Sequence, residues 1–280
     1  MNPSATPGGT PSTAIDAGPP RLVPAVERAV LLLDTLAGTG HPLSLADLAR
    51  SLALPKSSVH GLLTTLVALG LVRRDANGQF ALGAKPLQWA DAFASQSGLL
   101  RAFEAHARGF PALQAETVML AVLEGADVTY LSCRQGSRAL AVNFRVGGRF
   151  PAACTSSGKA MLASMPDDSV SALLGAGPLP RLTRHSVATV PALLGQLAAA
   201  RARGYALDDE ETAEGMQCFG APIFAARQPQ AVAAVAVSVI KAGLAARRRD
   251  EIVAAITGLA REISGALGGA QVPAVAPPAR

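Results

Sequence analysis

Apolar residues recur at helical spacing three times between residues 24 and 66. Over 24–37, one stripe of a predicted helix is apolar, at Val26, Ala29, Val30, Leu33 and Leu36. Ser44 and Asp47 then have the spacing of a capping box, which predicts a second, short helix over 44–51. A third helix is predicted from Pro55, taken as its first helical residue. Its buried positions follow the i, i+3, i+4, i+7 rule at Val59, Leu62, Leu63 and Leu66.

The opposite face of the third helix carries small polar and basic side chains. Arg73 and Arg74 follow it, and Asn77-Gly78 predicts a two-residue hairpin. This order of elements predicts a winged helix-turn-helix: two short helices, a third helix with a polar front, and a basic hairpin. The major groove of DNA admits such a third helix. The residues expected to contact double-stranded DNA are Ser44, Lys56, Ser57, Ser58, His60, Gly61, Thr64, Arg73 and Arg74.

Charge supports DNA binding modestly. Residues 21–85 hold seven lysines and arginines against four acids, so this segment carries +3 of the chain's net +5. Aromatic residues make up only 4% of the chain, which argues against binding RNA or single strands by base stacking. The alternative is a small helical bundle whose polar face is merely solvated.

The length of 280 residues allows two domains and the hydrophobic content of 50% allows a sizeable core. Cys133, Cys154 and Cys218 include no close pair, which indicates neither a disulfide framework nor a zinc site and fits a reducing cytoplasm. Residues 1–21 are rich in Pro, Gly, Ser and Thr and predict a disordered leader, while 270–280 predict a flexible tail. Apolar runs are too short for a membrane span.

The pattern changes after a connecting helix predicted over 85–102. Strand-like runs cover 117–123, 128–133, 139–145, 205–207, 217–224 and 231–240. Helical patterns cover 155–164, 167–174, 190–203 and 245–267. One sheet packed with helices is therefore expected over 103–269, and the fold class is α+β. The expected domains are a DNA-binding domain over 22–84, the linker helix over 85–102 and this second domain.

Several blocks of residues, in order, resemble the IclR-type bacterial transcriptional regulators from about residue 23 to residue 267. In the first domain they are 25–29 (AVERA), 44–49 (SLADLA), 54–60 (LPKSSVH) and 80–83 (FALG). In the second they are 155–163 (TSSGKAMLA), 203–206 (RGYA), 209–211 (DEE) and 215–218 (GMQC). The chain is identified on these blocks as a member of that family.

The resemblance implies a winged-helix domain, a linker helix and a GAF-like α/β effector domain, assembled as a homodimer or a dimer of dimers. It implies a repressor of a catabolic operon whose operator binding responds to an organic-acid-like metabolite. Two positions depart from the family pattern. Gly61 stands where an arginine often helps to contact DNA, and Ala53 stands where a glycine commonly serves the turn.

The family pattern also assigns an effector site, carried over by position to Ser156, Ser157, Gly158, Asp208, Cys218 and Ser238. The N–H groups at the start of the helix after Thr155 suit an anion. Ala236 replaces a second serine that the family often has, and Met119 and Phe144 are candidates for an apolar wall. The alternatives are that the serines only cap a helix, that Cys218 is a small buried residue and that Asp208 is a solvated charge.

Enzyme classes find little support in the sequence. Residues 156–159 match Ser-x-x-Lys, but the partner motifs of penicillin-recognising enzymes are missing. Gly158-Lys159 lacks the first glycine and the Ser/Thr of a phosphate-binding loop, and the four histidines have no metal-ligand spacing. We expect no enzyme activity, cofactor or metal. The alternative function is a small-molecule sensor that has lost specific DNA binding and acts through protein partners, which Gly61 alone favours.

Overall fold

The computed structural model describes residues 22–137 and 144–269 of the chain. The described residues divide after Phe93 into two compact units, and each is treated by itself. Among the helices of these residues, none combines the length and the apolar character needed to cross a membrane.

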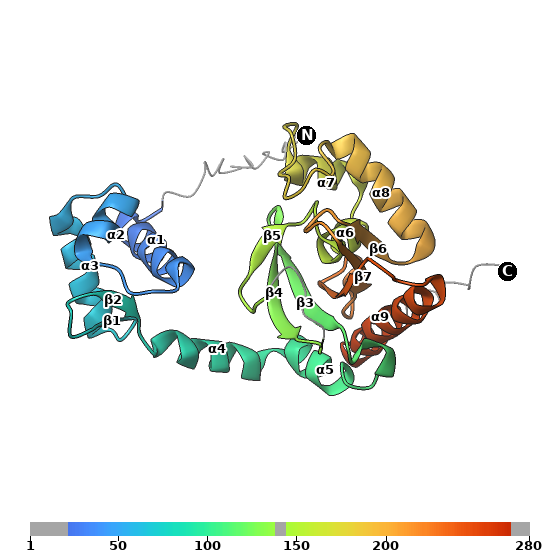
Figure 1. The fold of residues 1–280 in the computed structure, drawn as a ribbon, viewed down its shortest axis with the longest axis horizontal. Helices are drawn as coiled ribbons and strands as arrows, with labels where there is room; N and C mark the ends of the chain where they lie inside the picture. Colours follow the sequence, from blue (N-terminus) through green and yellow to red (C-terminus); the bar gives the residue numbers. More distant parts are fainter. Residues whose placement is uncertain (1–21, 138–143, 270–280) are drawn as a thin grey trace, which may run out of the picture. The chain divides into compact units, whose positions relative to one another are not determined.

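The first unit is a winged helix-turn-helix (Figure 1). Its helices are α1 (Pro24–Thr39), α2 (Leu45–Ser51) and α3 (Lys56–Ala68), and its strands are β1 (Val72–Arg74) and β2 (Phe80–Leu82). Leu43 pairs through both backbone groups with Phe80 and adds a third short strand-like segment to the wing. The core consists of Leu32, Leu36, Leu48, Ala49, Val59, Leu63, Leu66, Leu71, Val72 and Phe80, with Leu43 at its edge. The predicted order of elements is confirmed.

The predicted buried stripe of α1 was wrong in part. Leu32 and Leu36 are buried, whereas Val26 and Val30 are 62% and 50% exposed. Ala29, Leu32, Leu33 and Leu36 satisfy the same i, i+3, i+4, i+7 rule as the predicted set. Periodicity alone could not choose between these overlapping stripes, because α1 is apolar on two sides.

Local turn chemistry changes two further predictions. Pro55 occupies the N-cap position of α3 and is not its first helical residue. The wing is not a two-residue hairpin, because the Asp75 N–H donates to the Gln79 carbonyl at 2.8 Å and leaves Ala76, Asn77 and Gly78 in the loop. The Asp75 carboxylate accepts hydrogen bonds from the N–H groups of Asn77 and Gln79, each at 2.9 Å, and widens the loop. The N-cap of α2 is confirmed, since Ser44 Oγ accepts from the Asp47 N–H at 3.2 Å. Asp47 does reach back, but its carboxylate accepts from the Ser44 hydroxyl, where a full capping box would use the Ser44 N–H.

The predicted helix over 85–102 is observed as two helices, α4 (Lys85–Gln96) and α5 (Gly98–His106). Ser97 separates them, because its side chain accepts from the N–H of Leu100 and so caps α5. No residue of α4 is buried, and its large apolar side chains Leu87, Trp89 and Phe93 are all more than half exposed.

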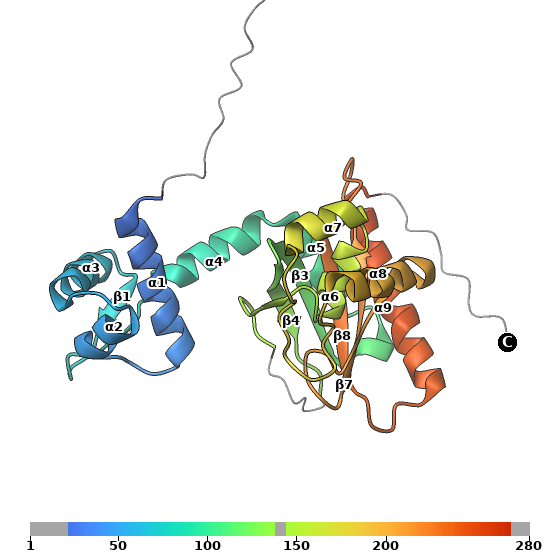
Figure 2. The same ribbon diagram turned by 90° about the horizontal axis from the view of Figure 1, so that it is seen from above.

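The second unit is built on one antiparallel sheet of order β5-β4-β3-β8-β7-β6. Its strands are β3 (Thr117–Glu124), β4 (Asp127–Arg134), β5 (Arg149–Pro151), β6 (Ala206–Asp209), β7 (Met216–Ile223) and β8 (Ala233–Ile240). Helices α6 (Ser156–Leu162), α7 (Asp167–Leu174) and α8 (Val190–Arg203) cover one face, and α5 and α9 (Ala246–Ala266) cover the other (Figures 1 and 2). The predicted α+β class is confirmed.

Two short elements of this unit were not predicted, namely strand β5 and a 3₁₀ turn η1 (Pro111–Leu113). Most of the strand predicted over 139–145 lies outside the described residues, and its described part, Phe144 and Arg145, is not in a strand. The predicted leader over 1–21 and tail over 270–280 also lie outside them.

Candidate functional site

The front of α3 presents polar side chains to solvent. Lys56, Ser57, His60 and Thr64 are exposed and Ser58 is half-buried, while Val59 and Leu63 on the back are buried. The Thr64 hydroxyl donates to the His60 carbonyl at 2.9 Å, which turns its methyl group outward. This face of α3 therefore presents one ammonium group, several hydroxyls and an imidazole to a duplex.

Gly61 leaves open space on this front. A Cβ atom built at Gly61 meets no atom within 4 Å, and the residue is exposed, so a side chain can extend from this position into solvent. Ala53, in the turn before α3, has a φ of 51°, in the left-handed region that favours glycine. Of the two departures from the family pattern, Gly61 thus leaves its position on the front of α3 without a side chain, and Ala53 strains the backbone of the turn.

The two wing arginines differ in their surroundings. The Arg74 guanidinium lies 5.6 Å from the centre of the Phe80 ring, and its Nε donates to the Gly78 carbonyl at 3.4 Å. Arg73 is exposed on the strand beside it. Ser44 donates to the Asp47 carboxylate at 2.6 Å, which lowers the pKa of Asp47. Arg74 and Ser44 thus also hold their own elements in place.

In the second unit, three predicted effector residues form one row across the sheet. Asp208 on β6 pairs with Cys218 on β7, and Cys218 pairs with Ser238 on β8. The Cys218 thiol lies 3.0 Å from the Ser238 hydroxyl, and Met119 Sδ lies 4.0 Å beyond that hydroxyl. All four side chains are buried. Three consecutive strands, together with Met119 from the distant β3, thus bring these groups together.

The N-terminus of α6 lies on this row of side chains. Gly220 on β7 lets the helix approach, because a Cβ there would lie 2.3 Å from the Ser156 carbonyl oxygen. Thr155 is the N-cap and accepts from the Gly158 N–H at 3.0 Å, so the predicted serines do not cap the helix themselves. Ser156 and Ser157 are buried, and the Tyr130 hydroxyl faces the Ser157 side chain.

Burial raises the pKa of Asp208 above its ordinary value of 3.8. Hydrogen bonds oppose that shift: Asp208 Oδ1 accepts from the N–H groups of Glu211 at 2.7 Å and Thr212 at 3.1 Å. Lys159 also favours the carboxylate through its charge. Burial likewise raises the pKa of the Cys218 thiol, with the Asp208 charge adding to it. The cluster therefore places side by side a thiol and a carboxyl group whose pKa values burial raises above their ordinary values.

A buried ion pair supports this cluster and was not predicted. Lys159 on α6 donates to Glu211, and the exposed fractions of the two side chains are 1% and 5%. Lys159 Nζ also donates to the Leu207 carbonyl at 3.3 Å, next to Asp208. From the sequence, Lys159 was considered only within enzyme motifs, and Tyr130 was missed. Tyr130 could have been found only from the alternation of residues along its strand, since that alternation places Tyr130 on the same face as the other buried side chains.

The apolar wall named from the sequence lies next to the same groups. Met119 and Phe144 belong to the core on the α6 side of the sheet. The Phe144 ring contacts the Tyr130 ring edge-on, with centroids 5.5 Å apart. Hydroxyls, a carboxyl group and helix N–H groups next to apolar side chains suit a small organic acid with a short apolar part. Over residues 22–137 and 144–269, no group of three or more His, Cys, Asp or Glu side chains is placed to hold a metal ion.

A DNA-reading helix with a basic wing on one unit, and a buried polar cluster on an α+β unit, define a one-component regulator that senses a small molecule. Comparison with known families gives the particular family. The IclR helix-turn-helix domain matches residues 25–76, and the bacterial transcriptional regulator IclR C-terminal domain matches residues 93–265. The chain belongs to the IclR family and is a ligand-responsive, DNA-binding transcriptional regulator.

Relatives align over nearly the whole chain. The transcriptional repressor IclR of Escherichia coli K12 is 31% identical over 251 residues, which cover 88% of this chain and 91% of that protein. The crystal structure of the Agobacterium tumefaciens repressor BlcR is 37% identical and covers 89% of this chain and 98% of its own, with a TM-score of 0.58. A third relative is an IclR homolog from Microbacterium hydrocarbonoxydans, whose crystal structure was solved in complex with 4-hydroxybenzoate. It is 26% identical and covers 87% of this chain and 99% of its own, with a TM-score of 0.71.

Proposed function

We propose that the protein represses a catabolic operon in the cytoplasm and releases its operator when a small organic acid binds the cluster around Asp208. The observation that carries the proposal is the row Asp208, Cys218 and Ser238 under the N-terminus of α6. In this proposal residues 22–84 read DNA, 85–102 transmit the signal and 103–269 bind the effector. The protein works without a cofactor and catalyses no reaction.

Contacts to DNA are proposed for the exposed front of α3 and for the wing. Lys56, Ser57, Ser58, His60 and Thr64 enter the major groove, with the backbone at Gly61 close to the bases. Arg73 contacts phosphate, while Arg74 holds the wing and contacts phosphate through its remaining N–H groups. Ser44 orients α2 against the backbone of the duplex.

Effector contacts are proposed for the groups that meet at the cluster. The Ser157 N–H group and the Ser156 hydroxyl receive the carboxylate of the ligand. Gly158, whose N–H is bonded to Thr155, contributes by letting the start of the helix pack against Ala152. Asp208 accepts a ligand hydroxyl, and Cys218 and Ser238 contact the carbon skeleton and a second oxygen. The 4-hydroxybenzoate bound by the Microbacterium homolog combines a carboxylate with a hydroxyl, which supports this class of ligand.

A homodimer or a dimer of dimers is proposed as the binding species. In the first unit, Leu22 and Val23 before α1 and Val26, Val30 and Leu31 on it are exposed, and α4 exposes Leu87, Trp89 and Phe93. Contiguous apolar faces of this kind favour association. A dimer presents two copies of α3, which matches a partly palindromic operator with half-sites about one helical turn apart.

Binding to DNA from the region upstream of the chain's own gene tests the proposal. We expect a sequence-specific gel shift whose affinity falls steeply with salt, and a shallower salt slope for Arg73→Ala. Arg184→Ala, an exposed arginine of the second unit, is the matched control and leaves the slope unchanged. If no fragment from a genomic library is bound specifically, the alternative of a sensor that acts through protein partners replaces this proposal.

A further inference from the structure

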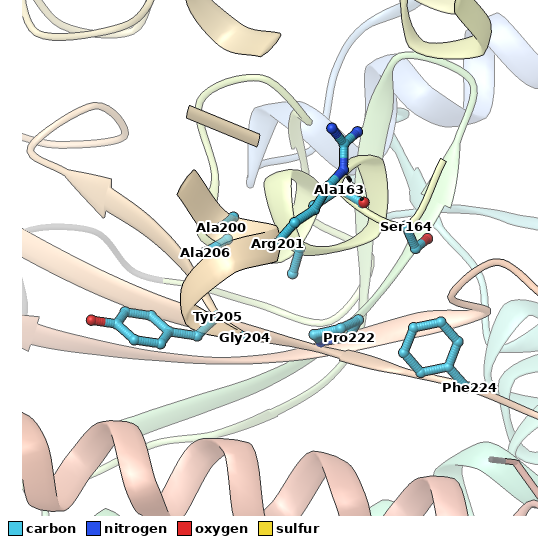
Figure 3. Close-up of a pocket in the computed structure, with 10 residues that line it drawn as sticks. Ala163, Ser164, Ala200, Arg201, Gly204, Tyr205, Ala206, Pro222 and Phe224 are labelled. Carbon is cyan, nitrogen blue, oxygen red and sulfur yellow. Dashed lines mark hydrogen bonds between the residues drawn. The ribbon is translucent and has the colours of Figure 1, made fainter. Parts of the chain in front are cut away.

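A cavity of about 190 Å³ opens in the second unit, apart from the cluster around Asp208 (Figure 3). It lies between α6, the end of α8 and strands β6 and β7. Small residues from α6 and α8, namely Ala160, Ala163 and Ala200, line it. The rings of Pro222 and Phe224 form another side, as Figure 3 shows.

The polar groups at this cavity are already engaged. The Arg201 guanidinium donates to the Ala163 carbonyl at 2.7 Å, to the Met165 carbonyl at 3.0 Å and to Asp167 at 2.7 Å. The Ser164 hydroxyl donates to the Met161 carbonyl at 2.6 Å and accepts from the Ala231 N–H at 2.9 Å. Tyr205 also lines the cavity with its ring, and the remaining surface is mostly methyl, methylene and aromatic, which favours a neutral ligand over an organic acid.

The size of the cavity sets the size of that ligand. An apolar protein cavity of about 150 Å³ stays dry and binds benzene. A cavity of about 190 Å³ therefore admits a single six-membered ring with one small substituent. We propose that this cavity is a second ligand site, selective for neutral monocyclic aromatic compounds.

Helix α6 belongs to both sites. Ser156 and Ser157 at its N-terminus lie over the Asp208 cluster, while Ala160 and Ala163, one turn further on, line the cavity. The helix also approaches β7 closely at Gly220, beside the effector cluster. An occupant of the cavity that shifts α6 therefore changes the effector site. This coupling rests on the proposed function, but binding to the cavity does not.

Toluene is the probe, added to the full chain without DNA and followed by isothermal titration calorimetry. We expect one binding event that Ala163→Leu weakens at least tenfold by filling the cavity. Ala199→Leu, the same change at an exposed position of α8, leaves toluene binding unchanged. Absence of binding to the unmodified protein, or equal binding to Ala163→Leu, overturns the proposal.

Should Ala163→Leu fail to fold by circular dichroism, Phe224→Ala takes its place. That change enlarges the cavity, so naphthalene is expected to gain affinity over toluene by about tenfold, and an unchanged ratio contradicts the proposal. Since no operator is present, failure here leaves the regulator function untouched.

Discussion

The Cys218 thiol and the Ser238 hydroxyl lie 3.0 Å apart on adjacent strands, fully enclosed by the second unit. Ser238→Ala removes the hydroxyl partner of a buried thiol. We expect the free energy of unfolding to fall by about 1 kcal/mol, the usual loss for one hydrogen bond, and urea denaturation measures it. Ser171→Ala is the control, because that hydroxyl only bonds within exposed α7. Equal stability of the two variants would contradict a structural role for the pair.

Gly61→Arg is expected to strengthen operator binding. The side chain enters open space on the front of α3 and adds a charge, so the slope of log affinity against log salt should steepen by about one unit. Gly61→Ala separates the two effects, since it raises helix stability by about 0.5–1 kcal/mol without adding charge. An unchanged salt slope in Gly61→Arg removes this position from the DNA interface.

Ala53→Gly is expected to stabilise the first unit. A non-glycine residue in the left-handed region costs about 1–2 kcal/mol, part of which the greater freedom of glycine in the unfolded chain offsets. The expected net gain in the free energy of unfolding is up to about 1 kcal/mol, seen as a higher melting temperature. Ala37→Gly, at an exposed helical position of α1, should lower stability instead. A loss of stability in Ala53→Gly would contradict the claim that the backbone at Ala53 is strained.

Asp208→Asn should stabilise the protein increasingly as pH rises. Below 3.8, the carboxyl group is protonated in both the folded and the unfolded chain, so the two proteins differ least. Because burial raises the folded pKa, ionisation costs the natural protein stability as pH rises through that pKa. Urea unfolding from pH 3.5 to 8 measures the difference. Asp91→Asn, at an exposed site on α4, should show no such trend, and a constant difference for Asp208→Asn would contradict the shifted pKa.

Much of the fold was predictable because its boundaries have local causes. Helix α8 runs from Val190 to Arg203 as predicted, since Thr189 caps its start and left-handed Gly204 ends it. The wing loop was predicted too short, because the competing hydrogen bonds of Asp75 are not part of a hydrophobic pattern. The buried stripe of α1 depends on tertiary packing, which periodicity does not contain.

The candidate site was only partly predictable. Positions such as Asp208 and Cys218 came from the family resemblance, and the structure brings them together. The Lys159–Glu211 pair joins residues 52 positions apart, and single charged residues usually indicate a solvated face. The acidic run that contains Asp208 illustrates this, because Asp209 and Glu210 do pair at the surface with Lys241 while Asp208 and Glu211 are buried.

The central claim is that a ligand at the Asp208 cluster controls operator binding by the other unit. Fluorescence anisotropy of a labelled operator, measured with a panel of small hydroxy acids and hydroxybenzoates, tests it most directly. We expect at least one acid to lower operator affinity tenfold or more, a coupling of about 1.4 kcal/mol. Asp208→Ala should bind the operator as the natural protein does and lose this response. The same response in Asp208→Ala and in the natural protein would contradict the account.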